Sequence, residues 1–113
     1  MSTADQQLAI GIDVGGTTIK GVLADTRGNI IATSEAVATP RTGAEDVVAA
    51  AARLARTLRE DSPEAPVGVC VPGIINEEQG IGIFSANLGW KDAPLGDMLS
   101  QALDSFVPLG HDV

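Results

Sequence analysis

The feature that most constrains this chain is a pair of glycines between two runs of strand-forming residues near its start. Residues 8–14 are mainly apolar, residues 15–16 are Gly-Gly, and residues 18–25 resume with β-branched side chains. A tight turn of this kind joins neighbouring antiparallel strands. A second turn sequence, TRGN at residues 26–29, precedes a further strand-like run over residues 30–39. The chain is therefore predicted to open with a three-stranded antiparallel meander.

A helix is predicted after the meander. Thr42 and Glu45 have the spacing of a capping box, and apolar side chains then recur at helical intervals over residues 47–58. Three arginines fall on the other side of this helix, where a solvated face explains them better than a binding patch. They are Arg53, Arg56 and Arg59.

The second half of the chain continues the alternation of strands and helices. Residues 65–71 are continuously apolar, which is typical of a fully buried strand parallel to its neighbour, and Cys70 inside this run is interpreted as a core residue. A hairpin over residues 74–84 and an amphipathic helix over residues 93–106 follow, and residue 107 begins another strand. The predicted fold class is α/β, with a mixed sheet flanked by helices.

Composition limits the partners and the location of the chain. Its 113 residues suit one compact domain. Fifteen acidic and seven basic residues give a formal net charge of −8, which repels polyanions and phospholipid surfaces, so no nucleic-acid or membrane partner is expected. Residues 1–7 lack the basic segment of a signal peptide, and the apolar run after them is broken by Asp13. A cytoplasmic location is therefore predicted.

Residues 11–21, GIDVGGTTIKG, carry the residue types of an anion-binding turn. Glycines let backbone N–H groups approach phosphate oxygens, threonine hydroxyls can donate to those oxygens, and a strand-end carboxylate such as Asp13 can hold Mg²⁺, often through water. A Walker loop would need a lysine directly after Gly16, where Thr17 stands, and no G-x-G-x-x-G spacing occurs. An ordinary glycine-rich hairpin turn remains the alternative.

Three segments carry a family resemblance. Residues 11–21 resemble the first phosphate motif of the superfamily of sugar kinases, actin and the heat-shock chaperones, and are most similar to the ROK group of bacterial sugar kinases and repressors. GVCVPG at residues 68–73 is similar to that family's strand and Pro-Gly turn beside the sugar, and SANLGW at residues 85–90 resembles its Asn-Leu-x-Trp loop. The resemblance implies a ribonuclease-H-like, actin-like ATPase domain and a kinase similar to glucokinase.

The resemblance also implies roles for individual residues. Gly73 and Asn87 match the family's sugar contacts, and Asp112 matches its catalytic base, which also lies at the sugar and accepts the proton of the attacking hydroxyl. His111 stands where the family has a sugar-contacting asparagine, so the identity of the sugar is open. From residue types alone, the alternatives are an Asn87 that caps backbone in a turn, and a solvated chain end that contains His111 and Asp112. The resemblance assigns the phosphates of ATP to Gly15, Gly16, Thr17, Thr18 and Lys20, and Mg²⁺ to Asp13.

An intact kinase of this family is considerably longer than this chain. Its second lobe supplies the adenosine pocket, a structural zinc cluster of cysteine and histidine, and further sugar-binding residues. Residues 1–113 are therefore expected to be a single, truncated N-terminal lobe without the C-terminal lobe and its zinc, and without turnover by itself. The surface that the second lobe would cover is expected to favour a homo-oligomer.

Three functions follow from these observations. The first is an ATP-dependent kinase for a hexose or an amino sugar, with ATP and Mg²⁺ as cofactors. The second is a sugar-responsive transcriptional regulator of the ROK type, which the acidic charge and the seven residues before Leu8 disfavour, because DNA-binding helices would stand there. The third is a catalytically dead half-domain that acts as a scaffold. The sequence does not separate ATP from polyphosphate as the donor.

Overall fold

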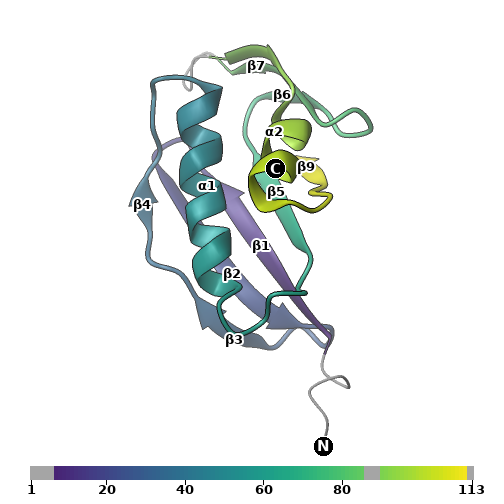
Figure 1. Ribbon diagram of the computed structural model, residues 1–113. Helices are drawn as coiled ribbons and strands as arrows, with labels where there is room; N and C mark the ends of the chain where they lie inside the picture. The colour runs from purple at the N-terminus through teal and green to yellow at the C-terminus, as the bar shows by residue number, and fades with distance from the viewer. Residues whose placement is uncertain (1–6, 86–89, 112–113) are drawn as a thin grey trace, which may run out of the picture.

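Two sheets and two helices make up the part of the chain that the computed structural model describes, residues 7–85 and 90–111 (Figure 1). In chain order the elements are β1 (Leu8–Val14), β2 (Thr18–Asp25), β3 (Ile30–Thr33), β4 (Val37–Ala38), α1 (Ala44–Leu58), β5 (Val67–Val71), β6 (Ile74–Asn76), β7 (Ile81–Ser85), β8 (Trp90–Ala93), α2 (Leu95–Leu103) and β9 (Leu109–His111). The larger sheet has the strand order β3-β2-β1-β5-β9, and β4 also pairs with β2. The smaller sheet has the order β6-β7-β8.

The meander predicted at the start of the chain is confirmed. β1 and β2 pair antiparallel along their whole length, and β3 and β4 both pair antiparallel with β2. The predicted third strand is divided in two, because the Gly21 N–H of β2 donates to the Ser34 hydroxyl at 2.8 Å instead of to a backbone carbonyl. The ladder is interrupted at residues 34–36, and β4 resumes it beside the first residues of β2.

One face of the larger sheet packs against the helices. Alternate residues of β1, β2 and β5 are buried on the face of the sheet that the helices cover. α1 lies over β1 and β2, and α2 lies beside α1 (Figure 1). The buried side chains are almost all branched aliphatic residues or alanine, in keeping with an aromatic content of 3%. Large and fully buried members of this core include Ile12, Val14, Ile19, Leu54, Val69, Val71, Leu95 and Leu99.

The burial of β5 differs from the prediction. Its parallel pairing is confirmed, since it runs parallel to β1 on one side and to β9 on the other. Its side chains alternate, however: Val67, Val69 and Val71 are buried, whereas Gly68 is half-buried and Cys70 is exposed. Because both helices cover the same face, every second residue of β5 belongs to the uncovered face. The predictions of a fully buried strand and of a core cysteine are therefore wrong.

α1 begins without the predicted capping box. Its N-cap is Gly43, with a φ of 119°, and no side chain caps its first turn. The Thr42 hydroxyl donates instead to the carboxylate of Asp46. The predicted pairing of Thr42 with Glu45 is wrong, because the chain enters the helix through a glycine whose positive φ leaves Thr42 outside the capping position.

The second hairpin and the second helix are confirmed, with changed ends. β6 and β7 pair antiparallel around a turn that contains Gly80, whose φ is 68°. β8, which is absent from the predicted elements, adds a third strand to this sheet by pairing with β7. α2 is shorter than the predicted residues 93–106, because Asp104 adopts a left-handed conformation (φ 52°) that ends the helix.

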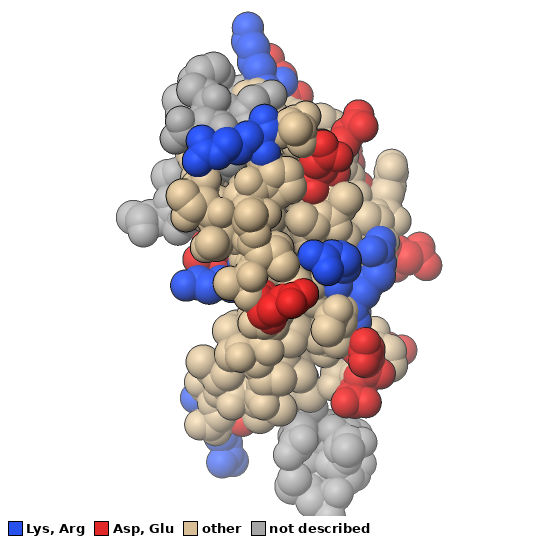
Figure 2. Space-filling view, turned by 90° about the vertical axis from the view of Figure 1, so that its left-hand side faces the viewer, with Lys and Arg blue, Asp and Glu red and all other residues tan. Residues whose placement is uncertain are grey.

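Acidic and basic side chains are interspersed on the side of the molecule that Figure 2 shows, with broad uncharged surface between them. The net charge of −8 is therefore not gathered into a single acidic patch on this side. Within residues 7–85 and 90–111, neither helix is long and apolar enough to cross a membrane.

Arg59 connects α1 to the C-terminal end of α2. Its guanidinium donates to the carbonyl oxygens of Ala65 at 2.9 Å and Leu103 at 3.2 Å. Arg56 donates in the same way to the Ala102 carbonyl oxygen at 3.0 Å. The contacts on α2 satisfy carbonyl groups that a helix end leaves without partners, and they place positive charge at the negative end of the helix dipole. The interpretation of a purely solvated arginine face is therefore wrong for Arg59, which is half-buried.

Replacing Arg59 with methionine should lower the free energy of unfolding by about 2 kcal/mol, because hydrogen bonds from a charged donor are lost. Arg53→Met is the matched control: Arg53 is exposed and its guanidinium lies 3.7 Å from the Glu35 carboxylate. Its loss should change stability by less than about 0.5 kcal/mol. Urea unfolding followed by circular dichroism measures both variants. Equal midpoints for the two would contradict the role given to Arg59.

Candidate functional site

The turn between β1 and β2 is tight and leaves its outer side open. The Gly15 N–H donates to the Thr18 carbonyl oxygen at 2.8 Å, which closes the turn. A Cβ at Gly15 would lie 2.9 Å from that oxygen, so a larger residue requires a backbone shift. A Cβ at Gly16 would meet nothing within 4 Å, and Gly16, Thr17 and Thr18 are exposed. The turn thus offers backbone N–H groups and two hydroxyls to an approaching anion.

Thr39 supports this turn from inside, although it is absent from the predicted site. Only 6% of its surface is exposed. Its hydroxyl donates to the Gly15 carbonyl oxygen at 2.8 Å, and its N–H donates to the Thr17 carbonyl oxygen at 2.9 Å. The sequence signal that could have found it is weak, because Thr39 is one threonine at the end of a strand-like run, 24 positions from the glycine that it contacts.

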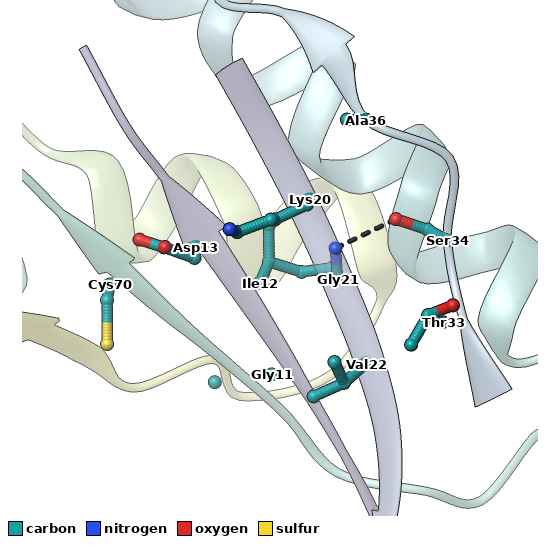
Figure 3. Close-up of a pocket in the computed structure, with 11 residues that line it drawn as sticks. Gly11, Ile12, Asp13, Lys20, Gly21, Val22, Thr33, Ser34, Ala36 and Cys70 are labelled. Atoms are coloured by element: carbon teal, nitrogen blue, oxygen red, sulfur yellow. Dashed lines mark hydrogen bonds between the residues drawn. The ribbon is translucent and has the colours of Figure 1, made fainter. Parts of the chain in front are cut away.

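A hollow of about 590 Å³ lies over the uncovered face of the larger sheet. Figure 3 shows this face with the helices behind the strands. Apolar atoms form most of its wall, so the hollow itself does not suit a sugar or a phosphate group. The residues that line it include Gly11, Val22, Ala36, Gly68 and Cys70, together with the charged residues Asp13 and Lys20.

Asp13 and Lys20 are neighbours at the end of the β1–β2 hairpin. The register places them opposite each other, and it also places Asp13 beside Cys70 of β5. The Oδ1 atom of Asp13 is buried and has no hydrogen-bond partner among the described residues. Buried polar atoms normally have a partner, so this oxygen suits a cation or an ordered water molecule. The donor set therefore fits Mg²⁺ held through water.

The carboxyl ends of β1, β5 and β9 meet at one edge of the larger sheet. The parallel registers put Asp13 beside Cys70, and Val71 beside His111. The turn after β1, the turn after β5 and the end of β9 consequently lie at the same edge. Gly73, in the turn after β5, has a φ of 92°, which favours glycine. The predicted nucleotide turn and the predicted sugar turn are thus neighbours.

The structure brings together part of the predicted site. Asp13, the turn residues 15–18, Lys20 and Gly73 are described, and His111 is placed as the last residue of β9. Two predicted residues lie outside the described residues: Asn87 and Asp112.

Trp90 joins the smaller sheet to α2. The side chain is 4% exposed and lies against Gly82 of β7, where a Cβ would come within 2.8 Å of its Nε1 atom and 2.7 Å of Leu95 Cδ1. The Trp90 Nε1 is buried and has no acceptor among the described residues. Trp90 is also the register partner of Ser85 in the pairing of β7 with β8.

Comparison with known proteins identifies the family. The sequence profile of the ROK family matches residues 9–113. The chain belongs to the ROK family. A glucokinase from Thermotoga maritima is 38% identical over 107 residues, covering 91% of this chain and 33% of that protein. The xylose repressor of Bacillus subtilis is 30% identical over 99 residues, covering 82% of this chain and 25% of the repressor.

Solved structures of ROK proteins confirm the predicted fold. A ROK glucokinase from Streptomyces griseus, in complex with glucose and AMPPNP, matches with a TM-score of 0.82 at 31% identity, covering 90% of this chain and 32% of that chain. The inorganic polyphosphate/ATP-glucomannokinase from Arthrobacter sp. strain KM also gives a TM-score of 0.82, at 32% identity, covering 93% of this chain and 44% of that chain. The α/β, actin-like ATPase fold is therefore established. The chain spans about a third of the length of the curated relatives it matches.

Gly15→Ala should lower the free energy of unfolding by about 1 to 3 kcal/mol, because its methyl group meets the Thr18 carbonyl oxygen and the backbone must shift. Gly16→Ala, one position along, is the matched control and should stay within about 0.5 kcal/mol of the parent chain, since its methyl group enters open space. Thermal unfolding of the two variants provides the comparison. If Gly16→Ala were the less stable variant, the turn would have a different conformation.

Gly82→Ala should expose Trp90 and shift its fluorescence emission to longer wavelength, because the added methyl group displaces the indole. The chain has one tryptophan and no tyrosine, so its emission reports on Trp90 alone. Gly68→Ala is the control, since a Cβ there would only touch Pro108 Cγ at 3.9 Å. An unshifted spectrum for Gly82→Ala would contradict the packing of Trp90 on Gly82.

Proposed function

We propose that this chain is the N-terminal lobe of an ATP-dependent sugar kinase, which transfers the γ-phosphate of ATP to a hydroxyl of a hexose or an amino sugar. The observation that carries the proposal is the shared edge of the larger sheet, where the β1–β2 turn and Asp13 lie beside the turn at Gly73 and the end of β9. Phosphoryl transfer requires donor and acceptor to be held side by side, which such an edge allows. The ROK glucokinase structure with glucose and AMPPNP supports the proposal.

The nucleotide is assigned to the β1–β2 turn. The N–H groups of Gly16 and Thr17 and the hydroxyls of Thr17 and Thr18 donate to phosphate oxygens, and the exposed Lys20 ammonium adds positive charge. Asp13 holds Mg²⁺ through water, with the carboxylate oxygen that lacks a partner among the described residues. When bound, Mg²⁺ neutralises the charge of the phosphate groups.

The sugar is assigned to residues that follow β5 and β7 and to the last residue of β9 and the residue after it. Gly73 lets the backbone approach the ring, and Asn87 offers both a donor and an acceptor to neighbouring hydroxyls. Asp112 contacts the attacking hydroxyl and accepts its proton as that oxygen bonds to the γ-phosphorus. The bond from this phosphorus to the oxygen that bridges to the β-phosphate breaks, and ADP leaves. His111 contacts the sugar in place of the family's asparagine, so the preferred sugar is expected to depend on this residue.

Residues 1–113 are proposed to act as one lobe of a two-lobed kinase. Because the chain spans about a third of the curated glucokinases it matches, the remaining contacts to nucleotide and sugar, and any structural zinc, are assigned to the rest of a full-length protein. The acidic net charge of −8 supports small-molecule partners rather than nucleic acid or membranes. A cytoplasmic location and assembly with further copies of itself are part of the same proposal.

A sugar-responsive regulator is the second candidate function. The 30% identity to the xylose repressor of Bacillus subtilis favours it, whereas the net charge of −8 disfavours contact between this lobe and DNA. A gel-shift assay with the full-length protein and the DNA upstream of its gene separates the two functions, because only a regulator gives a shift that sugar changes.

The proposed function is tested with the full-length protein and a panel of hexoses and amino sugars, with ATP or polyphosphate as donor. Asp112→Asn should lower kcat by a factor of about 10² to 10⁴ and leave the sugar dissociation constant unchanged, because the base is lost while the shape of the side chain is kept. Full turnover by Asp112→Asn would remove this residue from the role of base. A wild-type protein that phosphorylates none of the sugars would overturn the function itself.

A further inference from the structure

Among the described residues, Thr39 is the one polar side chain buried to this degree, with 6% of its surface exposed. It directly follows β4, whose two residues pair with the first residues of β2. This pairing brings Thr39 to the inner side of the β1–β2 turn, although the two segments are far apart in the sequence. Its hydrogen bonds go to the turn and not to other core residues.

The hydrogen bonds of Thr39 go to carbonyl oxygens of the turn and not to its N–H groups. The Gly15 and Thr17 carbonyl oxygens accept from the Thr39 hydroxyl and N–H at 2.8 and 2.9 Å, and the Thr18 carbonyl oxygen accepts from the Gly15 N–H at 2.8 Å. The N–H groups of Gly16 and Thr17, by contrast, donate to no described residue. Carbonyl oxygens repel phosphate oxygens, whereas N–H groups attract them. Thr39 therefore supplies two of the three contacts that hold carbonyl groups on the inner side.

We infer that Thr39 is a positioning residue for phosphate binding by the β1–β2 turn. Its hydroxyl holds the Gly15 carbonyl inward, so that the Gly16 and Thr17 N–H groups keep the arrangement that an anion requires. Thr39 itself is buried and does not touch the nucleotide. The inference rests on the proposed function, and it names a residue outside the turn on which nucleotide affinity depends.

The test compares four variants of the full-length protein by titration with Mg·AMPPNP and by steady-state kinetics. Thr39→Val keeps the volume of the side chain but removes the donor, and should weaken AMPPNP binding and raise the KM for ATP by about tenfold, with the KM for the sugar unchanged. Thr39→Ser keeps the hydroxyl and should bind AMPPNP like the wild type.

Thr57→Val is the matched control. The Thr57 hydroxyl donates to the Arg53 carbonyl oxygen at 3.1 Å on the exposed surface of α1, so this variant also loses a hydroxyl-to-carbonyl hydrogen bond. Thr39→Ala, which removes the hydroxyl together with the γ-methyl group, takes the place of Thr39→Val if that variant does not fold.

The possible results distinguish a failure of this inference from a failure of the proposed function. Wild-type affinity for AMPPNP in both Thr39→Val and Thr39→Ala would overturn the inference, as would a Thr39→Ser variant as weak as Thr39→Val, because the hydroxyl would then have no part. An equal rise in the KM values for ATP and sugar would also overturn it, since a general loss of structure affects both. A wild-type protein that binds AMPPNP but phosphorylates no sugar would overturn the proposed function, while the AMPPNP titrations would still decide the role of Thr39.

Discussion

The parallel pairing of β1 with β5 is the interaction on which the rest of the structure depends. Parallel strands need a crossover connection, and α1 provides it on one face of the sheet. Gly21 of β2 lets α1 pack closely on the sheet because it has no side chain. A Cβ at this position would lie 2.6 Å from Ile12 Cδ1 and 3.0 Å from Leu58 Cδ1 of α1. The same pairing, extended to β9, gathers the carboxyl ends of three strands at one edge, where the candidate site lies.

Because the helices cover only one face of the larger sheet, alternate residues of its strands lie on an uncovered face. The valines of β5 enter the core, whereas Cys70 and Gly68 between them belong to the uncovered face and line the hollow there. Asp13 occupies the same face at the end of β1, which explains how a charged residue follows Ile12 in a strand with a buried side. Asp13 thus lies on the uncovered face and also close to the edge of the sheet, next to the β1–β2 turn.

The turns that were predicted from neighbouring residues are confirmed, whereas several features that depend on distant partners were not predicted. The glycine turn of the first hairpin and the turn at Gly80 follow from short-range chemistry. β8, with the sequence WKDA, has no strand-like pattern and is a strand because it pairs with β7. In the sequence, Arg59 belongs to a solvated arginine face and Thr39 only ends a strand-like run. Their roles depend on α2 and on the β1–β2 turn, which lie far from them in the sequence.

The sequence by itself determined the order of most strands and helices, the position of the β1–β2 turn and the acidic balance of charge, because each of these depends on residue types or on neighbours a few positions apart. Only the tertiary structure decided that Cys70 is exposed, that the turns after β1 and β5 share an edge, and that Thr39 holds the turn from inside. These features depend on strand register and on which face the helices cover. Both are set by the packing of segments far apart in the chain, which no local pattern records.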